Sequence, residues 1–219
     1  MKKPAHTRSA AMTGRRLAGH FFETFLSKNI VLIQAIAICP IIAVGTELKL
    51  GVVLTLCTAA VLLPTSLCMS LIGEKLPPWL RPPVYTVGAS LLLLGAAAIV
   101  DHISPKIYAD LYLFLPLMAV NTIFTYRAGG FCVSNRPAAA IVDAAGSSCG
   151  FGLVICAVSC IREIAIYGTV WGHPLEFDLR LPEAALPYAA FIMLGFMAAL
   201  LQWIKSIAAR VTAKKEAAL

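Results

Sequence analysis

Two proline-containing segments carry the side chains best suited to chemistry in this sequence. Cys39 directly precedes Pro40 in an otherwise apolar run, and the pair Asn121-Thr122 follows Pro116 in a second apolar run. A proline inside a helix removes a backbone hydrogen bond and leaves carbonyl oxygens that lipid cannot satisfy. We therefore expect both segments to be broken helices whose breaks face protein or a cavity. Cys39 is either a ligand at such a break or simply a small apolar side chain.

Ionisable side chains stand near the ends of other apolar runs, where they are costly. Asp101 follows the third apolar run, and Asp143 precedes the fifth, at the expected start of a helix whose dipole favours a carboxylate. Both carboxylates are candidates for handling a coupling ion, and both have the simpler interpretation of interfacial anchors or helix caps. Arg162 and Glu163 are interpreted as an ion pair, either structural or at a contact with another subunit.

Most of the other cysteines have a packing interpretation. Cys149, Cys156 and Cys160 are spaced seven and four residues apart and so share one face of a helix. A redox or metal role is open to them, but small side chains at a seam between helices explain this spacing better. Gly146 and Gly150 form a small-xxx-small pair on the same segment, which favours close helix packing.

Six charge-free runs must position these side chains, and each is close to the roughly 17–25 residues that a helix needs to cross a bilayer. The runs are 29–46, 50–73, 82–100, 111–126, 144–161 and 184–204. The composition agrees, because 59% of the 219 residues are hydrophobic and only 13% are charged, against about a quarter in soluble domains. The runs lack the alternation of barrel strands. We predict an all-α membrane protein with six transmembrane helices, and not a soluble enzyme.

The charge distribution predicts the orientation in the membrane. Fourteen of the 18 lysines and arginines fall on the side of the N-terminus, and four fall on the other side, at Lys49, Lys106, Arg162 and Arg180. By the positive-inside rule both termini are expected in the cytoplasm. The net charge of +7 is thereby explained by topology and by contact with anionic lipid, not by a nucleic acid partner.

The same reasoning divides the chain into three parts. We expect a cytoplasmic N-terminal segment at 1–28, a six-span membrane domain at 29–207 and a cytoplasmic basic tail at 208–219. Apolar side chains recur every fourth residue along 15–28, which predicts a short amphipathic helix. That helix either lies on the membrane surface or continues directly into the first span.

The two broken helices are the first and the fourth of six, so they open two halves of three spans each. An odd number of spans places the halves in opposite orientations, and matching interrupted helices are typical of inverted repeats around a midplane site. A secondary transporter or channel has the same architecture. Against it, the polar side chains near the breaks are few: Gln34, Asn121 and Thr122 beside Cys39.

Several segments, taken in order, resemble a known family. They are Leu32–Pro40, Leu115–Asn121, Arg127-Ala128, Asp143–Gly146, Gly150–Gly152, Ile161–Ile164 and Tyr167–Thr169. Together they are similar to the six-span membrane subunits of Rnf-type electron transport complexes and of the sodium-translocating NADH:quinone reductase. The closer branch is the Rnf E subunit with its D counterpart in the reductase. The resemblance covers about residues 28–207.

The resemblance implies a subunit of an ion-translocating complex in the bacterial inner membrane, not catalytic alone, with flavin and iron–sulfur chemistry on partner subunits. In the family, two homologous subunits of opposite topology share one 2Fe–2S cluster. Each supplies one cysteine from its broken first helix and one from its broken fourth helix. Cys39 occupies the first position, but Thr122 stands at the second, and a neutral hydroxyl is a poor substitute for a thiolate.

Three interpretations of Thr122 remain open. Cys132, ten residues further along the chain, replaces the missing ligand; or the cluster persists with unusual ligation; or the cluster is absent and the chain is a structural subunit. The resemblance also associates the positions of Asp101 and Asp143 with the coupling ion, Na⁺ or H⁺.

Overall fold

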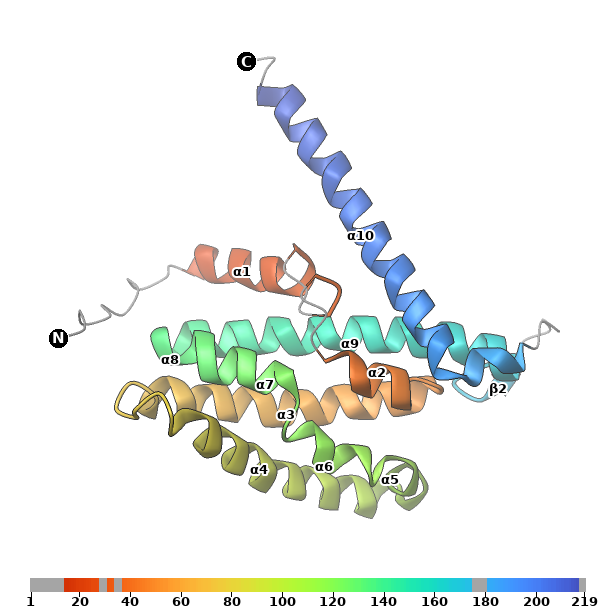
Figure 1. Ribbon diagram of the computed structural model, residues 1–219, viewed down its shortest axis with the longest axis horizontal. Helices are drawn as coiled ribbons and strands as arrows, with labels where there is room; N and C mark the ends of the chain where they lie inside the picture. Colours follow the sequence, from red (N-terminus) through yellow and green to blue (C-terminus); the bar gives the residue numbers. More distant parts are fainter. Residues whose placement is uncertain (1–13, 28–30, 34–36, 175–180, 217–219) are drawn as a thin grey trace.

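The computed structural model describes residues 14–27, 31–33, 37–174 and 181–216, and these parts are almost entirely helical (Figure 1). Four long helices make up most of the molecule: α3 (Leu48–Ile72), α4 (Arg81–Ile103), α9 (Pro137–Tyr167) and α10 (Pro187–Glu216). The short helices are α1 (Gly14–Phe22), α2 (Ile38–Val44), α5 (Pro105–Leu111), α6 (Phe114–Met118), α7 (Thr122–Tyr126) and α8 (Cys132–Ser134). Irregular turns are the π-helical η1 (Glu23–Ser27) and η2 (Arg127–Phe131) and the 3₁₀ turn η3 (Pro182–Ala185). A small hairpin pairs β1 (Thr169–Val170) with β2 (His173–Pro174).

Within the described residues, four helices are long and apolar enough to cross a membrane: α3, α4, α9 and the Pro187–Ile207 part of α10. The bent pair of α5 with the segment Phe114–Tyr126, angled by 59°, makes a fifth candidate if it is one span. The prediction of a helical membrane protein is confirmed, and the described residues hold four candidate crossings, or five with the bent pair, where six were expected. In the first expected span, 31–33 form a turn and 38–44 form α2. The positions 28–30 and 34–36, with Gln34, lie outside the described residues.

The two expected breaks are present, but the prolines do not create them in the expected way. Pro40 is the third residue of α2, and Pro116 is the third residue of α6. At such positions a missing N–H costs little, because the first N–H groups of a helix have no partner within it. The breaks lie before Pro40, at Ala37, and after Pro116, between α6 and α7. Each proline therefore lies in the first turn of a short helix next to a break.

The helices α3 and α9 form the centre of the bundle and lie side by side (Figure 1). Small residues let them approach closely: a Cβ added at Gly51 would lie 2.9 Å from Ser159 Oγ, and one added at Gly152 would overlap Thr55. Apolar side chains such as Leu54 are fully buried in this contact. Small residues thus form a seam on α9, but not the ones expected: Cys149 is exposed, and Gly146 packs against α1 and η1.

The N-terminal helix α1 lies alongside α9 as part of the bundle (Figure 1). The close approach occurs at Gly146, where an added Cβ would lie 3.1 Å from the Phe21 carbonyl oxygen and 3.2 Å from Thr24 Cβ. The short helix predicted within 15–28 is present as α1 and η1, and the glycine at position 146 of α9 lets both approach closely.

The last helix leaves the bundle, and Figure 1 shows α10 extending away from the other helices. Large apolar side chains along it are exposed, among them Phe191, Phe196 and Trp203. The helix continues to Glu216, so most of the expected basic tail at 208–219 is helical. A long apolar surface of this kind fits contact with lipid or with neighbouring subunits.

The α3–α9 seam yields a stability prediction. Replacing Gly152 by Leu forces a side chain into the space held by Thr55, so we expect the free energy of unfolding to fall by about 1–3 kcal/mol or more. Gly95→Leu on α4 is the matched control, because an added Cβ there meets nothing within 4 Å. Thermal unfolding of both variants in the same detergent measures the effect. Equal midpoints for the two variants would contradict the packing of α3 on α9.

Candidate functional site

The two helix breaks meet at one place. The backbone N–H of Ala37, just before α2, donates to Thr122 Oγ1 at the start of α7 over 3.2 Å, although the residues are 85 positions apart. Ala37 has a left-handed conformation (φ 63°, ψ 31°). On the other side, Asn121 caps α7 by accepting the N–H of Ile123 with its side-chain oxygen at 3.2 Å.

A cavity of about 320 Å³ opens beside this junction, between α2 and the break of α6 and α7. Cys39, Asn121 and Thr122 contribute the thiol, amide and hydroxyl of its lining, and the other lining residues are apolar or, at Met118, a thioether. Cys39 is exposed. The structure therefore brings Cys39 and Thr122 to the same cavity, as expected from the two breaks.

Cys132 does not line this cavity. It lies in α8, fully buried in the core and near Ser66, Arg127 and Asp143. Burial raises the pKa of the Cys132 thiol to about 12, so the thiol is protonated at neutral pH. A thiol enclosed in the core, away from the cavity that Cys39 lines, is not placed to bind a cluster there. In the described part of the chain, no group of three or more His, Cys, Asp or Glu residues is placed to hold a metal ion.

A second polar group surrounds Asp143, which is 0% exposed. Its Oδ1 accepts a hydrogen bond from Arg127 Nη1 at 2.8 Å and from Thr24 Oγ1 at 3.3 Å, and lies 3.2 Å from His20 Nε2. Asp143 Oδ2 and Arg127 Nε are buried and have no hydrogen-bond partner among the described residues. This cluster joins α1, η1, η2 and α9.

The structure corrects the expected place of Asp143. It is the seventh residue of α9, one turn inside the helix, so it neither precedes the helix nor caps it. The sequence also gave no sign of His20 as its partner, because 123 residues separate them and no local pattern connects them. Asp101 is exposed in the last turn of α4. The end of α4 and the start of α9 lie at opposite ends of the bundle (Figure 1), so the two carboxylates form no common site.

Arg162 and Glu163 are both buried, and each binds backbone groups. Arg162 donates to the carbonyl oxygens of Ile42 in α2 at 3.0 Å, of Ala184 at 3.0 Å and of Ala185 at 2.7 Å. The expected ion pair is therefore replaced, on the side of the arginine, by contacts that close the end of α2 and hold η3.

Glu163 satisfies the opposite kind of backbone group. Its carboxylate accepts the N–H of Leu48, the first residue of α3, at 2.8 Å, and the N–H of Gly172 in the β-hairpin at 3.0 Å. Thr169 Oγ1 donates to the same carboxylate at 3.3 Å. One pair of charged neighbours on α9 thus holds together the ends of two helices and the hairpin.

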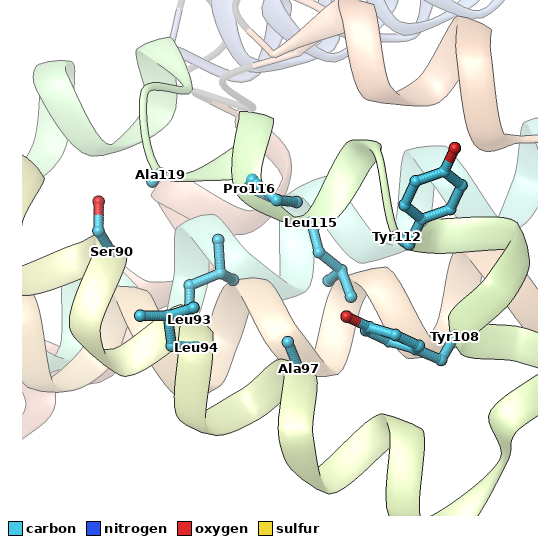
Figure 2. Close-up of a pocket in the computed structure, with 9 residues that line it drawn as sticks. All are labelled: Ser90, Leu93, Leu94, Ala97, Tyr108, Tyr112, Leu115, Pro116 and Ala119. Carbon is cyan, nitrogen blue, oxygen red and sulfur yellow. The ribbon is translucent and has the colours of Figure 1, made fainter.

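A separate cavity of about 210 Å³ lies between α4 and the segment α5–α6. Figure 2 shows Leu93, Ala97 and Leu115 around it, with Tyr108 and Tyr112 at one side. The lining holds neither a charged side chain nor a thiol, and Ser90 Oγ is already bonded to the Thr86 carbonyl at 2.8 Å. This cavity offers mainly apolar contact, with Tyr108 and Tyr112 as its titratable side chains.

Known proteins resemble the chain over most of its length. Residues 17–198 match the family described as Rnf-Nqr subunit, membrane protein. The E subunit of the Na(+)-translocating ferredoxin:NAD(+) oxidoreductase complex of Acetobacterium woodii is 29% identical over 180 residues, 81% of this chain and 92% of that one. The E subunit of the ion-translocating oxidoreductase complex of Shewanella oneidensis is 30% identical over 184 residues, 77% of this chain and 79% of that one. Its counterpart in Shewanella loihica is 30% identical over 202 residues, 85% of this chain and 87% of that one.

The buried cluster yields a second prediction. Asp143→Ala leaves the Arg127 guanidinium buried without its partner, so we expect the free energy of unfolding to fall by about 3–5 kcal/mol. The control is Asp101→Ala, an exposed carboxylate whose loss is expected to change stability by about 0.5 kcal/mol or less. Unfolding of both variants in lipid nanodiscs measures the difference. If the free energy of unfolding fell by a similar small amount in both variants, Arg127 and Asp143 would not be energetically coupled.

Proposed function

Since the chain belongs to the Rnf-Nqr family of membrane subunits, we propose that it is the E-type subunit of an ion-translocating electron transport complex. Its relatives from Acetobacterium woodii and Shewanella oneidensis are the E subunits of such complexes. The observation that carries the proposal is the junction of two helix breaks, with the exposed thiol of Cys39 in a cavity beside it.

In this proposal the chain relays electrons across the bacterial inner membrane through a 2Fe–2S cluster that it shares with a homologous six-span subunit of opposite topology. The cluster supplies one-electron transfer when it is bound. Cys39 is suited to ligate it, because its side chain is exposed at the cavity and does not lie in the core. Flavin and further iron–sulfur centres belong to other subunits.

The donor set of this chain fits one ligand of such a cluster and does not fit a second. Cys39 offers a sulfur atom. Thr122 offers a neutral hydroxyl that already accepts the N–H of Ala37, whereas thiolates are the usual cluster ligands. Cys132 is enclosed elsewhere in the core. We therefore derive no step through a second ligand from this chain.

We also propose that the chain crosses the membrane six times as two inverted halves, with both termini in the cytoplasm. Two observations support this arrangement. The breaks occur at α2 and between α6 and α7, in corresponding places of the two halves. The unbroken helices α3 and α9, which follow the breaks in each half, pack against each other at the centre. The excess of lysine and arginine on the side of the N-terminus supports the proposed orientation.

Asp143 and Asp101 remain our candidates for the coupling ion. At Asp143 the guanidinium of Arg127 already compensates the charge of the carboxylate, so either H⁺ or Na⁺ would have to compete with that ion pair. His20 Nε2 lies 3.2 Å from the same carboxylate. Asp101 is a candidate by its position alone.

A second candidate function is a structural subunit without a cluster, and a specific observation favours it: Thr122 takes the place of a thiol and is engaged in a backbone contact. A transporter or channel has less support, since the cavity at the breaks holds no charged side chain.

The third prediction concerns iron. We expect the chain, co-purified anaerobically with its opposite-topology partner subunit, to bind iron and to give a reduced 2Fe–2S signal in low-temperature EPR. Cys39→Ser is expected to abolish both, while Cys149→Ser, an exposed cysteine outside the cavity, leaves both unchanged. A well-assembled pair without iron would refute the relay and favour the structural subunit.

The fourth prediction concerns the second ligand position. Thr122→Cys adds a second sulfur to the cavity that Cys39 lines, so we expect a higher iron content per pair of subunits than in the wild type. Iron analysis with EPR integration provides the measurement, and the same substitution in a Cys39→Ser background is the control. Unchanged iron content would contradict the placement of the cluster at this cavity.

A further inference from the structure

We propose that Thr122 locks the two helix breaks together and so positions Cys39, and that it is not itself a ligand. The chain then contributes a single sulfur atom to the junction. The lock is argued from hydrogen bonds alone. The claim that this chain supplies a single cluster ligand rests on the function proposed above.

The backbone at Ala37 creates the need for a lock. Its conformation is left-handed, which residues other than glycine, asparagine and aspartate seldom adopt, and the residue is only 5% exposed. A backbone N–H in such a place has no helical partner and little access to water, so it needs an acceptor from elsewhere in the protein. Thr122 Oγ1, at 3.2 Å, is that acceptor.

The Thr122 hydroxyl forms hydrogen bonds on both sides of the junction. A threonine hydroxyl has one hydrogen to donate and two lone pairs. It accepts from Ala37 and donates to Asn121 Oδ1 over 3.4 Å. The same Asn121 oxygen accepts the N–H of Ile123, and Asn121 Nδ2 donates to Met118 Sδ at 3.3 Å, which fixes the orientation of the amide. A connected chain of hydrogen bonds therefore runs from one break to the other.

This chain of hydrogen bonds reaches Cys39 through the backbone. Only Ile38 separates Cys39 from Ala37, so the backbone direction at Ala37 decides where the first turn of α2 places the thiol. With Ala37 held by Thr122, the thiol lies at the cavity that both breaks line. A cysteine at position 122 would be a weaker acceptor for the Ala37 N–H, since sulfur accepts hydrogen bonds poorly. Sulfur ligation and this lock are thus alternative uses of position 122.

The test compares Thr122→Val, which keeps the shape but removes the hydroxyl, with Thr122→Ser, which keeps the hydroxyl. Amide hydrogen exchange at Ala37, Ile38 and Cys39 is measured on the full chain in lipid nanodiscs. The loss of one hydrogen bond is expected to speed exchange at Ala37 by about tenfold in Thr122→Val. Thr122→Ser should stay within about twofold of the wild type.

A matched control is Thr125→Val, one turn further along α7, which removes the contact of Tyr85 OH with Thr125 Oγ1 and leaves the junction alone. The rate of Cys39 alkylation by N-ethylmaleimide, followed by mass spectrometry with Cys149 as an internal reference, is a second readout. We expect it to change several-fold in Thr122→Val and to be restored in Thr122→Ser. Wild-type exchange and alkylation in Thr122→Val would overturn the lock.

The number of ligands is tested separately on the pair of subunits. If Thr122 is not a ligand, any loss of iron in Thr122→Val comes from displacement of Cys39 and is accompanied by faster exchange at Ala37, whereas Cys39→Ser abolishes iron binding. Loss of iron in Thr122→Val, together with wild-type exchange at Ala37, would identify the hydroxyl as a ligand and refute the inference. Absence of iron from the wild-type pair would remove the proposed cofactor, whereas the exchange experiment decides the lock on its own.

Discussion

A backbone N–H or carbonyl group that leaves a helix inside a membrane must find a partner within the protein, because the hydrocarbon offers none. The rest of this structure depends on that constraint. The chain has two such breaks. The N–H exposed by one break, at Ala37, donates to Thr122 at the other break. The second break therefore satisfies the first, its own helix α7 is capped by Asn121, and the cavity with Cys39 lies where the two breaks meet.

The same constraint explains the buried charges near the C-terminal end of α9. Arg162 compensates carbonyl oxygens at the end of α2 and in η3, and Glu163 compensates the N–H groups at the start of α3 and in the hairpin. Each charged group is expensive to bury alone, and each is stabilised by several hydrogen bonds to the backbone. The Arg127–Asp143 pair differs, because two of its atoms stay without hydrogen-bond partners among the described residues.

The molecule has a closely packed centre and an outer surface with exposed apolar side chains. The helices α3 and α9 approach closely through Gly51 and Gly152, so they form a firm support for the half-helices beside them. In contrast, α4 and α10 present large apolar side chains to the outside. The relay that we propose would need this combination, since its ligand must be held firmly while the surface next to it meets another chain.

Local features of the sequence were enough to predict the class of protein, most of the helices and the two segments that break, because hydropathy and proline act over short stretches of chain. They also assigned Cys39 and Thr122 to equivalent breaks. The folded arrangement was needed to establish which polar atoms meet: Ala37 with Thr122, His20 with Asp143, and Arg162 with carbonyl groups in place of the expected Glu163. Such partners lie far apart in sequence, and their contact depends on the register in which packed helices align, which no local pattern specifies.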